Sequence, residues 1–112
     1  MPKKKYILWF KEINNKDVPK VGGKNASLGE MYSKLTSKGV AIPNGFAVTA
    51  QAYDYFVTTQ GVKKQIRKIL KDLNTHDIHN LQERAKAVRE AILAADFPQD
   101  LNDQIIAAYK KL

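Results

Sequence analysis

The stretch VGGKNASLGE, residues 21–30, contains the change of pattern that decides the fold of this chain. The residues before it are polar and end in the pair Gly22-Gly23, whereas apolar residues recur after it at the spacing of one helix face. These apolar positions are Leu28, Met31, Tyr32 and Leu35. Asn25 is a suitable N-cap, so we expect the helix to begin there. Lys24 then lies at the helix N-terminus, where the dipole disfavours a cation unless an anion binds.

The residues on either side of this helix predict two short strands. Tyr6–Phe10 is an apolar and aromatic run that is too short for a helix. Residues 46–49 form a second such run, directly after the turn signal Asn44-Gly45. Residues 11–23, which contain Pro19 and two glycines, are predicted to be loop. Two strands of this length make only a marginal sheet by themselves.

Helices are predicted for most of the remaining chain. Gly39 ends the first of them in the left-handed conformation, and the apolar periodicity predicts four more. They run from the cap Thr49 to Gly61, from Val62 to Asn74, from the cap Asp77 through Ile92, and from Pro98 to Leu112. We expect Trp9 and Phe10 to pack on the first helix, and Arg84 and Arg89 to face solvent. The predicted fold class is therefore α+β, with short N-terminal strands followed by a mainly helical bundle.

The composition is that of a globular domain: of 112 residues, 44% are hydrophobic and 27% are charged. No apolar run approaches the length of a membrane span, and the basic start MPKKKYILWF lacks the long apolar region of a secretory signal. The chain has no cysteine, which excludes disulfides and thiolate chemistry. We therefore expect a cytoplasmic protein. Because the last predicted helix reaches Leu112 without a stop signal, we expect residues 1–112 to be the N-terminal part of a longer chain.

The net charge of +8 raises the alternative of a basic, helical module that binds nucleic acid. Residues 1–24 contribute +5 of this charge and the rest of the chain contributes +3. The excess is thus concentrated at the N-terminus, where Lys3–Lys5 are typical of a solvated tail. The nearly balanced helical part argues against this alternative, so we expect neither nucleic acid nor a membrane as a partner.

Lys24 and its glycines do not complete either common phosphate-binding motif. The P-loop pattern would need a glycine at Val18 and a Ser or Thr at Asn25, and no arrangement of the glycines fits G-x-G-x-x-G. The shared physical elements are nevertheless present: glycines that allow a phosphate to approach, helix N–H donors, and a lysine. The same residues are compatible with an exposed loop that binds nothing. His76 and His79 lack a nearby third ligand, so neither is predicted to bind a metal.

Two longer strings carry a resemblance to a known family. Residues 21–31, VGGKNASLGEM, resemble the opening nucleotide-binding motif of the phosphoenolpyruvate synthases. Residues 42–49, IPNGFAVT, resemble their second motif, Val-Pro-x-Gly-Phe-Ala-x-Thr. Together the two strings are specific to the pyruvate-phosphate-dikinase superfamily. The run from Asn25 to Leu28 favours the synthases, because the dikinases proper and the rifampin phosphotransferases tend to have Gly-Gly-Lys-Gly-Ala-Asn-Leu.

The resemblance implies the first subdomain of an ATP-grasp-like nucleotide-binding domain. It implies that Lys24 contacts the phosphates of ATP and that Gly22 and Gly23 form the loop around them. The family carries out the gluconeogenic conversion of ATP, pyruvate and water to phosphoenolpyruvate, AMP and phosphate by way of a phosphohistidine. The catalytic histidine, the Mg²⁺ ligands and an Arg-Ser-Ser segment are expected beyond Leu112, in the remaining domains of the same chain.

The resemblance also limits what residues 1–112 are expected to do alone. We expect no catalytic and no metal-binding residue among them, and no activity from this part by itself. Pyruvate phosphate dikinase and rifampin phosphotransferase are the alternatives within the superfamily. They share the nucleotide domain, and rifampin phosphotransferase transfers the phosphate to an antibiotic hydroxyl.

Overall fold

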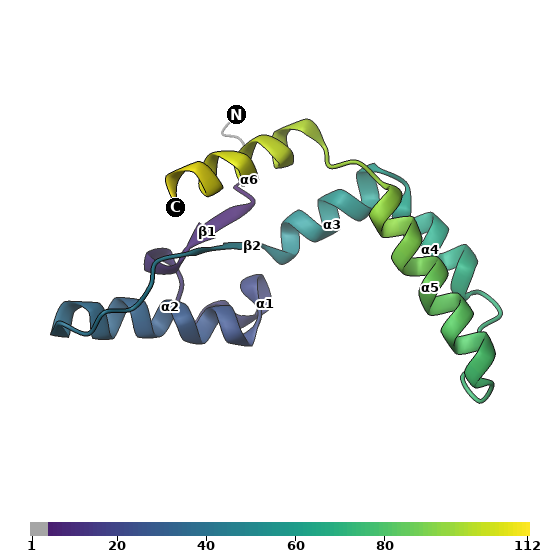
Figure 1. Cartoon of the computed structure of the whole chain (residues 1–112), viewed down its shortest axis with the longest axis horizontal. Coiled ribbons are helices and arrows are strands. Elements are labelled where there is room, and N and C mark those ends of the chain that lie inside the picture. The colour runs from purple at the N-terminus through teal and green to yellow at the C-terminus, as the bar shows by residue number, and fades with distance from the viewer. Residues whose placement is uncertain (1–4) are drawn as a thin grey trace. The chain divides into compact units, whose positions relative to one another are not determined.

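The computed structural model describes residues 5–112, which form two short strands and a succession of helices (Figure 1). The strands are β1 (Ile7–Trp9) and β2 (Phe46–Val48). The α-helices are α1 (Val18–Val21), α2 (Gly23–Leu35), α3 (Ala50–Thr59), α4 (Val62–Leu70), α5 (Ile78–Ala94) and α6 (Gln99–Lys111). The 3-10 helices are η1 (Phe10–Glu12), η2 (Asn15–Asp17) and η3 (Thr36–Lys38). The predicted α+β class is confirmed; Lys3 and Lys4 of the predicted tail lie outside the described residues.

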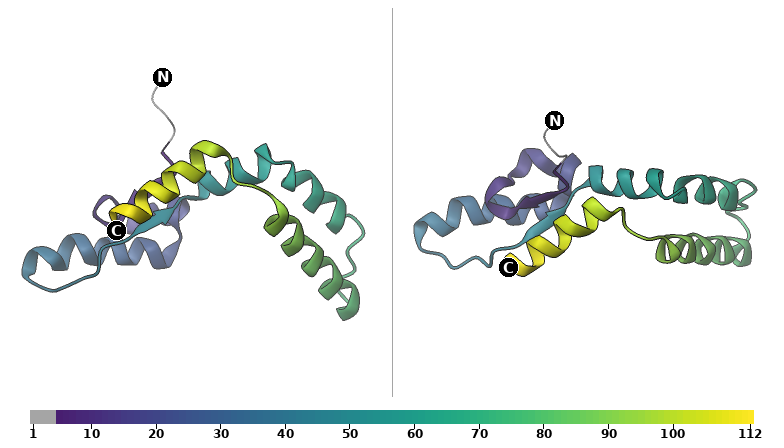
Figure 2. Two further views of the ribbon diagram at one scale, coloured as in Figure 1. Left: turned by 45° about the horizontal axis from the view of Figure 1, so that its top comes forward. Right: turned by 90° about the horizontal axis from the view of Figure 1, so that it is seen from above.

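The chain divides into two compact units. The first contains the chain up to Tyr53 together with Gln99–Leu112, and the second is Asp54–Pro98. In the first unit, α6 and α2 lie on opposite sides of the two strands (Figures 1 and 2). In the part of the chain that the structure describes, no helix is both long and apolar enough to cross a bilayer.

The core of the first unit lies between the strand pair and α2. β1 and β2 pair antiparallel, with Leu8 opposite Ala47. Leu8 and Phe10 pack against a cluster of buried residues: Ile13, Val21, Ala26 and Ala47. Phe10 also donates its N–H to the Gly45 carbonyl at 3.0 Å, which continues the pairing past the end of β1. The prediction that Phe10 packs on the first helix is therefore confirmed.

Trp9 lies on the other face of the strand pair. Successive side chains of a strand point to opposite faces, so Trp9 and Phe10 separate where β1 ends. The Trp9 ring contacts its cross-strand partner Phe46 at a centroid distance of 5.4 Å, tilted by 59°. Trp9 also lines a groove with Ala107 and Ala108 of α6. The prediction that Trp9 packs on the first helix is wrong, because strand alternation turns it toward α6.

Three predicted helix boundaries are confirmed in atomic detail. The Thr49 hydroxyl accepts a hydrogen bond from the Ala52 N–H at 3.2 Å, at the start of α3. Asp77 caps α5 by accepting from the Asn80 N–H, also at 3.2 Å. Gly39 has φ 86° and ends the turn that follows α2 in the left-handed conformation. Each of these boundaries depends on a local interaction that the residue type alone supplies.

The second unit is built around α4 and α5, which pack side by side (Figure 2). α4 ends at Leu70, earlier than the predicted Asn74, and turns follow it. Arg84 was expected to face solvent, but it is half-buried and donates a hydrogen bond to the Ile69 carbonyl in the last turn of α4. A guanidinium is well suited to the unpaired carbonyls of a helix C-terminus. Arg89 is exposed, as predicted.

A candidate phosphate-binding loop

The segment before the candidate loop is more helical than predicted. The Asn14 side chain accepts a hydrogen bond from the Lys16 N–H at 2.8 Å, and the Asp17 carboxylate accepts from the Asn14 N–H at 3.0 Å. This capping box starts η2, and Pro19 then lies in the first turn of α1, where its fixed φ suits a helix. The prediction of loop over residues 11–23 is therefore wrong for η1, η2 and α1. Local capping outweighs the proline and glycine signals there.

The helix that carries Lys24 begins earlier than predicted. Its N-cap is Gly22, whose φ of 85° and ψ of 163° lie in a region that is almost confined to glycine. Asn25, the predicted N-cap, is instead the third residue of α2. Its Nδ2 donates to the Val21 carbonyl at 2.9 Å and so satisfies an acceptor at the end of α1. The predicted capping role of Asn25 is wrong, because the conformation of Gly22 allows the helix to start at Gly23.

The first turn of α2 presents three backbone donors that no group in residues 5–112 accepts. The Ala26 N–H makes the first bond of the helix, to the Gly22 carbonyl at 3.0 Å. The N–H groups of Gly23, Lys24 and Asn25 precede it and have no acceptor within the helix. α2 has no side-chain cap and no acidic residue in its first turn. This end of the helix therefore combines free donors with the positive end of the dipole.

Lys24 lies in the middle of these donors and is exposed. Among the ion pairs of the described residues, none involves Lys24. Together with Gly23, Ser27 and Leu28 it lines an open depression in the surface of α2. Lys24 was predicted as a site residue from the sequence. Ser27 and Leu28 were not, although they follow it at the i+3 and i+4 spacing of one helix face.

The two predicted loop glycines differ in what they require of the backbone. A Cβ added at either Gly22 or Gly23 would meet no atom within 4 Å. Gly22 is needed for its positive φ, but Gly23 has no such conformation. Glycine in the first turn of a helix weakens it relative to alanine. Neither space nor backbone geometry within the described residues thus explains a glycine at position 23.

The other end of the quoted stretch is tightly packed. Gly29 lies against Ile13, and a Cβ added there would come within 2.5 Å of the Ile13 Cβ and 2.6 Å of its carbonyl oxygen. The buried residues of α2 are Ala26 and Gly29. Small residues therefore make the contact with the core, and the helix backbone approaches Ile13 closely.

This packing corrects the predicted apolar face of α2. Leu28 and Met31 belong to the predicted apolar stripe, but they do not face the core: their exposed fractions are 37% and 41%. Both lie on the same side of the helix as Lys24, since residues 24, 28 and 31 follow at i, i+4 and i+7. The periodicity correctly predicts an apolar stripe on α2. The stripe begins beside Lys24 and runs along the side of the helix that does not face the core.

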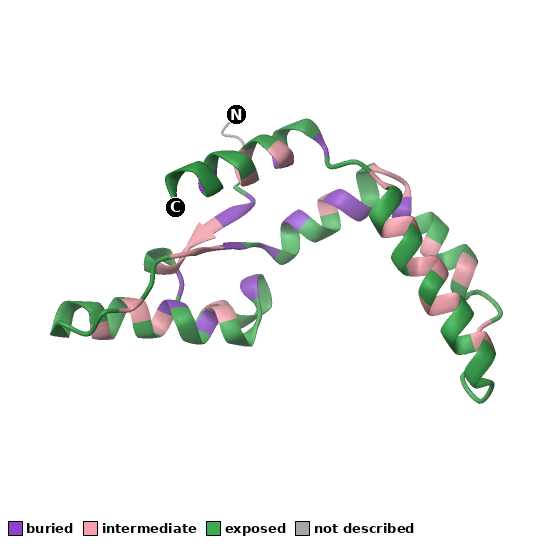
Figure 3. Ribbon diagram, viewed as in Figure 1, coloured by how far each residue is buried: buried purple, intermediate pink, exposed green. Residues whose placement is uncertain are grey.

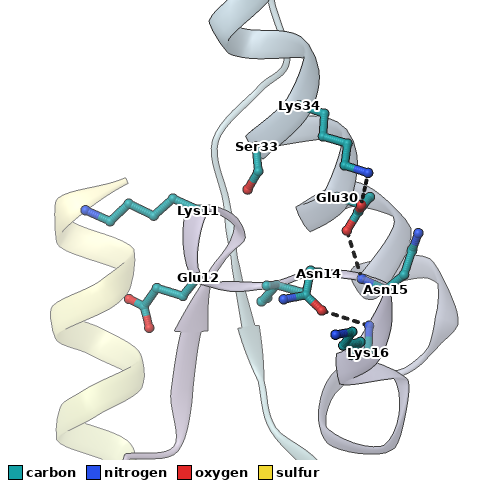
Figure 4. Close-up of a pocket in the computed structure, with 9 residues that line it drawn as sticks. Lys11, Glu12, Asn14, Asn15, Lys16, Glu30, Ser33 and Lys34 are labelled. Carbon is teal, nitrogen blue, oxygen red and sulfur yellow. Dashed lines mark hydrogen bonds and ion pairs between the residues drawn. The ribbon is translucent and has the colours of Figure 1, made fainter.

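Glu30 links α2 to the segment before it through contacts with Asn15 and Lys34, and we call these three residues the Glu30 clasp. The Glu30 carboxylate accepts the Asn15 N–H at 3.0 Å and pairs with Lys34 at 2.7 Å (Figure 4). The hydrogen bond with Lys34, followed by that with the Asn15 N–H, lowers the pKa of Glu30, and the same carboxylate raises the pKa of Lys34. The depression drawn in Figure 4 is lined by this clasp and by Lys11 and Lys16, and it does not include Gly22, Gly23 or Lys24.

No metal site is evident in residues 5–112, where no group of three or more His, Cys, Asp or Glu side chains is placed to hold an ion. His76 and His79 are both exposed. The candidate site therefore consists of a lysine, backbone donors and glycines, which is chemistry for binding an anion.

Comparisons with known proteins converge on one family. Residues 18–112 match the family described as pyruvate phosphate dikinase, AMP/ATP-binding domain. The chain is 50% identical over 103 residues to the phosphoenolpyruvate synthase of Synechocystis sp., and 45% identical over 108 residues to that of Helicobacter pylori. It is 39% identical over 106 residues to the phosphoenolpyruvate synthase of Escherichia coli K12. These alignments cover 92%, 96% and 95% of this chain, but only 13% of each relative.

Proposed function

The chain belongs to the pyruvate phosphate dikinase AMP/ATP-binding domain family, and on that premise we propose that Gly22, Gly23 and Lys24 hold the phosphates of ATP. The observation that carries this proposal is the first turn of α2. An unpaired lysine, three free N–H groups and a glycine without a structural reason of its own lie together there. A phosphate chain needs all three: positive charge, donors, and room for its oxygens beside the backbone.

Each part of the loop has a separate task in this proposal. Gly22 turns the backbone so that the N–H groups of α2 point at the ligand, and Gly23 leaves its surface open for a phosphate oxygen. Lys24 adds a point charge whose repulsion from the helix dipole is relieved when the anion binds. Bound ATP supplies the phosphoryl group; the residues of this chain bind and orient it. Leu28 and Met31 offer an apolar surface next to the phosphates.

For the whole protein we propose phosphoenolpyruvate synthesis. The relatives named phosphoenolpyruvate synthase support pyruvate as the acceptor over an antibiotic hydroxyl. The chain spans 13% of their length, so the phosphohistidine, the pyruvate site and the ligands of Mg²⁺ are expected in other parts of a longer protein. The ATP-grasp-like architecture and the cytoplasmic location remain predictions.

The proposal is tested with Lys24→Ala and a matched control, Lys38→Ala, which removes another exposed lysine from the opposite end of the same helical segment. In the 112-residue chain, ATP should shift the backbone amide NMR signals of Gly23, Lys24 and Asn25, and Lys24→Ala should abolish the shifts. In the longer gene product, Lys24→Ala should lower AMP release on the order of 100-fold. Its free energy of unfolding should stay within about 0.5 kcal/mol of the parent, as expected for an exposed residue.

Two outcomes would contradict the proposal. One is an equal loss of ATP binding in Lys24→Ala and Lys38→Ala, which would reduce the effect to net charge. The other is normal AMP release by the Lys24→Ala gene product. Circular dichroism of each variant separates a lost binding site from a lost fold.

A further inference from the structure

The break between α1 and α2 leaves free the three amides of the proposed phosphate loop. In a helix without a break, the N–H groups of residues 23–25 would donate to the carbonyls four residues earlier. The bonds on either side of the break are made, because Gly22 donates to the Val18 carbonyl at 2.8 Å and Ala26 donates to the Gly22 carbonyl at 3.0 Å. The break is therefore confined to the three donors between them.

The same break leaves three carbonyls without these partners, and the residues that carry them differ in exposure. Pro19 and Lys20 are exposed, so water can reach their carbonyls, whereas Val21, the last residue of α1, is buried (Figure 3). The carbonyl of a buried residue needs a hydrogen-bond partner. The Asn25 side chain supplies it, since its Nδ2 donates to the Val21 carbonyl at 2.9 Å. Asn25 thus pairs its side chain, in place of its backbone N–H, with this acceptor.

An asparagine at this position is unfavourable for α2 by itself. Asparagine forms helices less well than alanine, and as the third residue of α2 Asn25 does not cap the helix. Glycine has the greatest backbone freedom, so fixing Gly22 at a φ of 85° costs entropy that neighbouring contacts have to offset. The bond from Asn25 to Val21 spans Gly22 and provides such a contact.

We propose that Asn25 is a positioning residue for ATP: its side chain keeps the chain broken at Gly22 and so keeps the three loop amides available to the phosphates. This role rests on the proposed function of the loop, but Asn25 acts through the backbone and its side chain needs no contact with the nucleotide. Without that side chain, the Val21 carbonyl is satisfied when the N–H of residue 25 donates to it, as in a continuous helix, and that N–H is then lost to the ligand. A smaller population of the open loop lowers the affinity for ATP in the same proportion.

The first measurement is made on the 112-residue chain without ATP. The three-bond couplings between the amide and α protons of Gly22 report its φ. Asn25→Ala removes the side-chain donor and keeps the N–H of residue 25, so we expect these couplings to change. Asn102→Ala is the matched control, because Asn102 is also a half-buried asparagine of a helix in the first unit, and it should leave the couplings of Gly22 unchanged.

The second measurement is the ATP dependence of AMP release by the longer gene product. Asn25→Ala should raise the KM for ATP about tenfold, the scale of one net hydrogen bond, with little change in kcat. Asn102→Ala should change this KM less than about twofold.

Unchanged couplings of Gly22 in Asn25→Ala would overturn the positioning role, and a raised KM beside them would assign Asn25 a direct contact with the nucleotide. Changed couplings with the parental KM would also overturn it, because the bond would then be structural only. Normal AMP release by Lys24→Ala would instead contradict the proposed function itself, so the two failures are distinguishable. Circular dichroism verifies the fold of each variant. If Asn25→Ala does not fold, Asn25→Asp, which keeps the shape but has no donor, takes its place in the coupling measurement, with the same change expected.

Discussion

The helices α2 and α4 begin in the same way, yet only one of them resembles a ligand site. Each has a glycine N-cap with positive φ, Gly22 at 85° and Gly61 at 72°, and neither has a side-chain cap. Each places a lysine second in the helix. The two helices differ in the residue between the glycine cap and the lysine. In α2 this residue is Gly23, which is exposed and has open space around it, whereas in α4 it is Val62, which is fully buried.

This difference shows that a glycine cap and a lysine do not make a phosphate site by themselves. In α4 the first residue is used for packing, so its side chain fills the space that a ligand would need. In α2 the packing is moved along the helix to Ala26 and Gly29, and the first turn is left free. The free turn thus depends on how the middle of α2 is anchored.

The largest effect on stability is expected from a substitution at Gly29, where α2 packs against Ile13. Gly29→Ala would bring a Cβ within 2.5 Å of the Ile13 Cβ, against backbone that cannot easily move. We expect a loss of about 3 kcal/mol in the free energy of unfolding, at the upper end for overpacking. Urea denaturation measures this, with Ser27→Ala on the exposed side of the helix as the control. A loss below about 1 kcal/mol would show that α2 is not held by this close contact.

Substitution by alanine should change stability in opposite directions at the first residue of α4, Val62, and at the first residue of α2, Gly23. Val62→Ala removes buried methyl groups and should cost about 1–3 kcal/mol. Gly23→Ala should raise the stability of the chain by about 0.5–1 kcal/mol, because alanine favours a helix. It should also weaken ATP binding in an NMR titration, since the added Cβ enters the space proposed for a phosphate oxygen. If Gly23→Ala bound ATP normally, the glycine would not be needed for ligand approach.

The smallest effect is expected from the clasp of Glu30, which has no equivalent at α4. The pKa of Glu30 is lowered from its usual value of 4.5, so its contribution to stability is present above that pH and lost as the pH falls through the folded-state pKa. The pKa of Lys34 is raised from 10.5, so the contribution of Lys34 is lost in strong alkali. Thermal unfolding between neutral pH and pH 3 should therefore show a smaller drop in Tm for Glu30→Gln than for the parent. Equal drops would mean that the clasp does not stabilise the native state.

Much of the fold follows from local chemistry that is visible in the sequence. Thr49, Asp77 and Gly39 end or begin helices in the predicted way, because caps and left-handed turns depend on the residue itself and its nearest neighbours. The sequence also makes Gly22, Gly23 and Lys24 candidates for a phosphate loop, through the chemistry they share with such loops and through the family strings; that they hold ATP remains a proposal.

Other features were decided by tertiary contacts. The sequence alone predicted an apolar stripe on α2, but it did not show which face of the helix meets the core. Gly29 can approach Ile13 more closely than a leucine can, so the small residues face the core and Leu28 stays exposed. Asn25 ties α1 to α2 instead of capping, because the backbone of Gly22 already turns the chain. Arg84 turns inward because the last carbonyls of α4 lie within its reach. Periodicity and residue type determined which segments are helical; which face is buried was settled by close packing between segments distant in sequence.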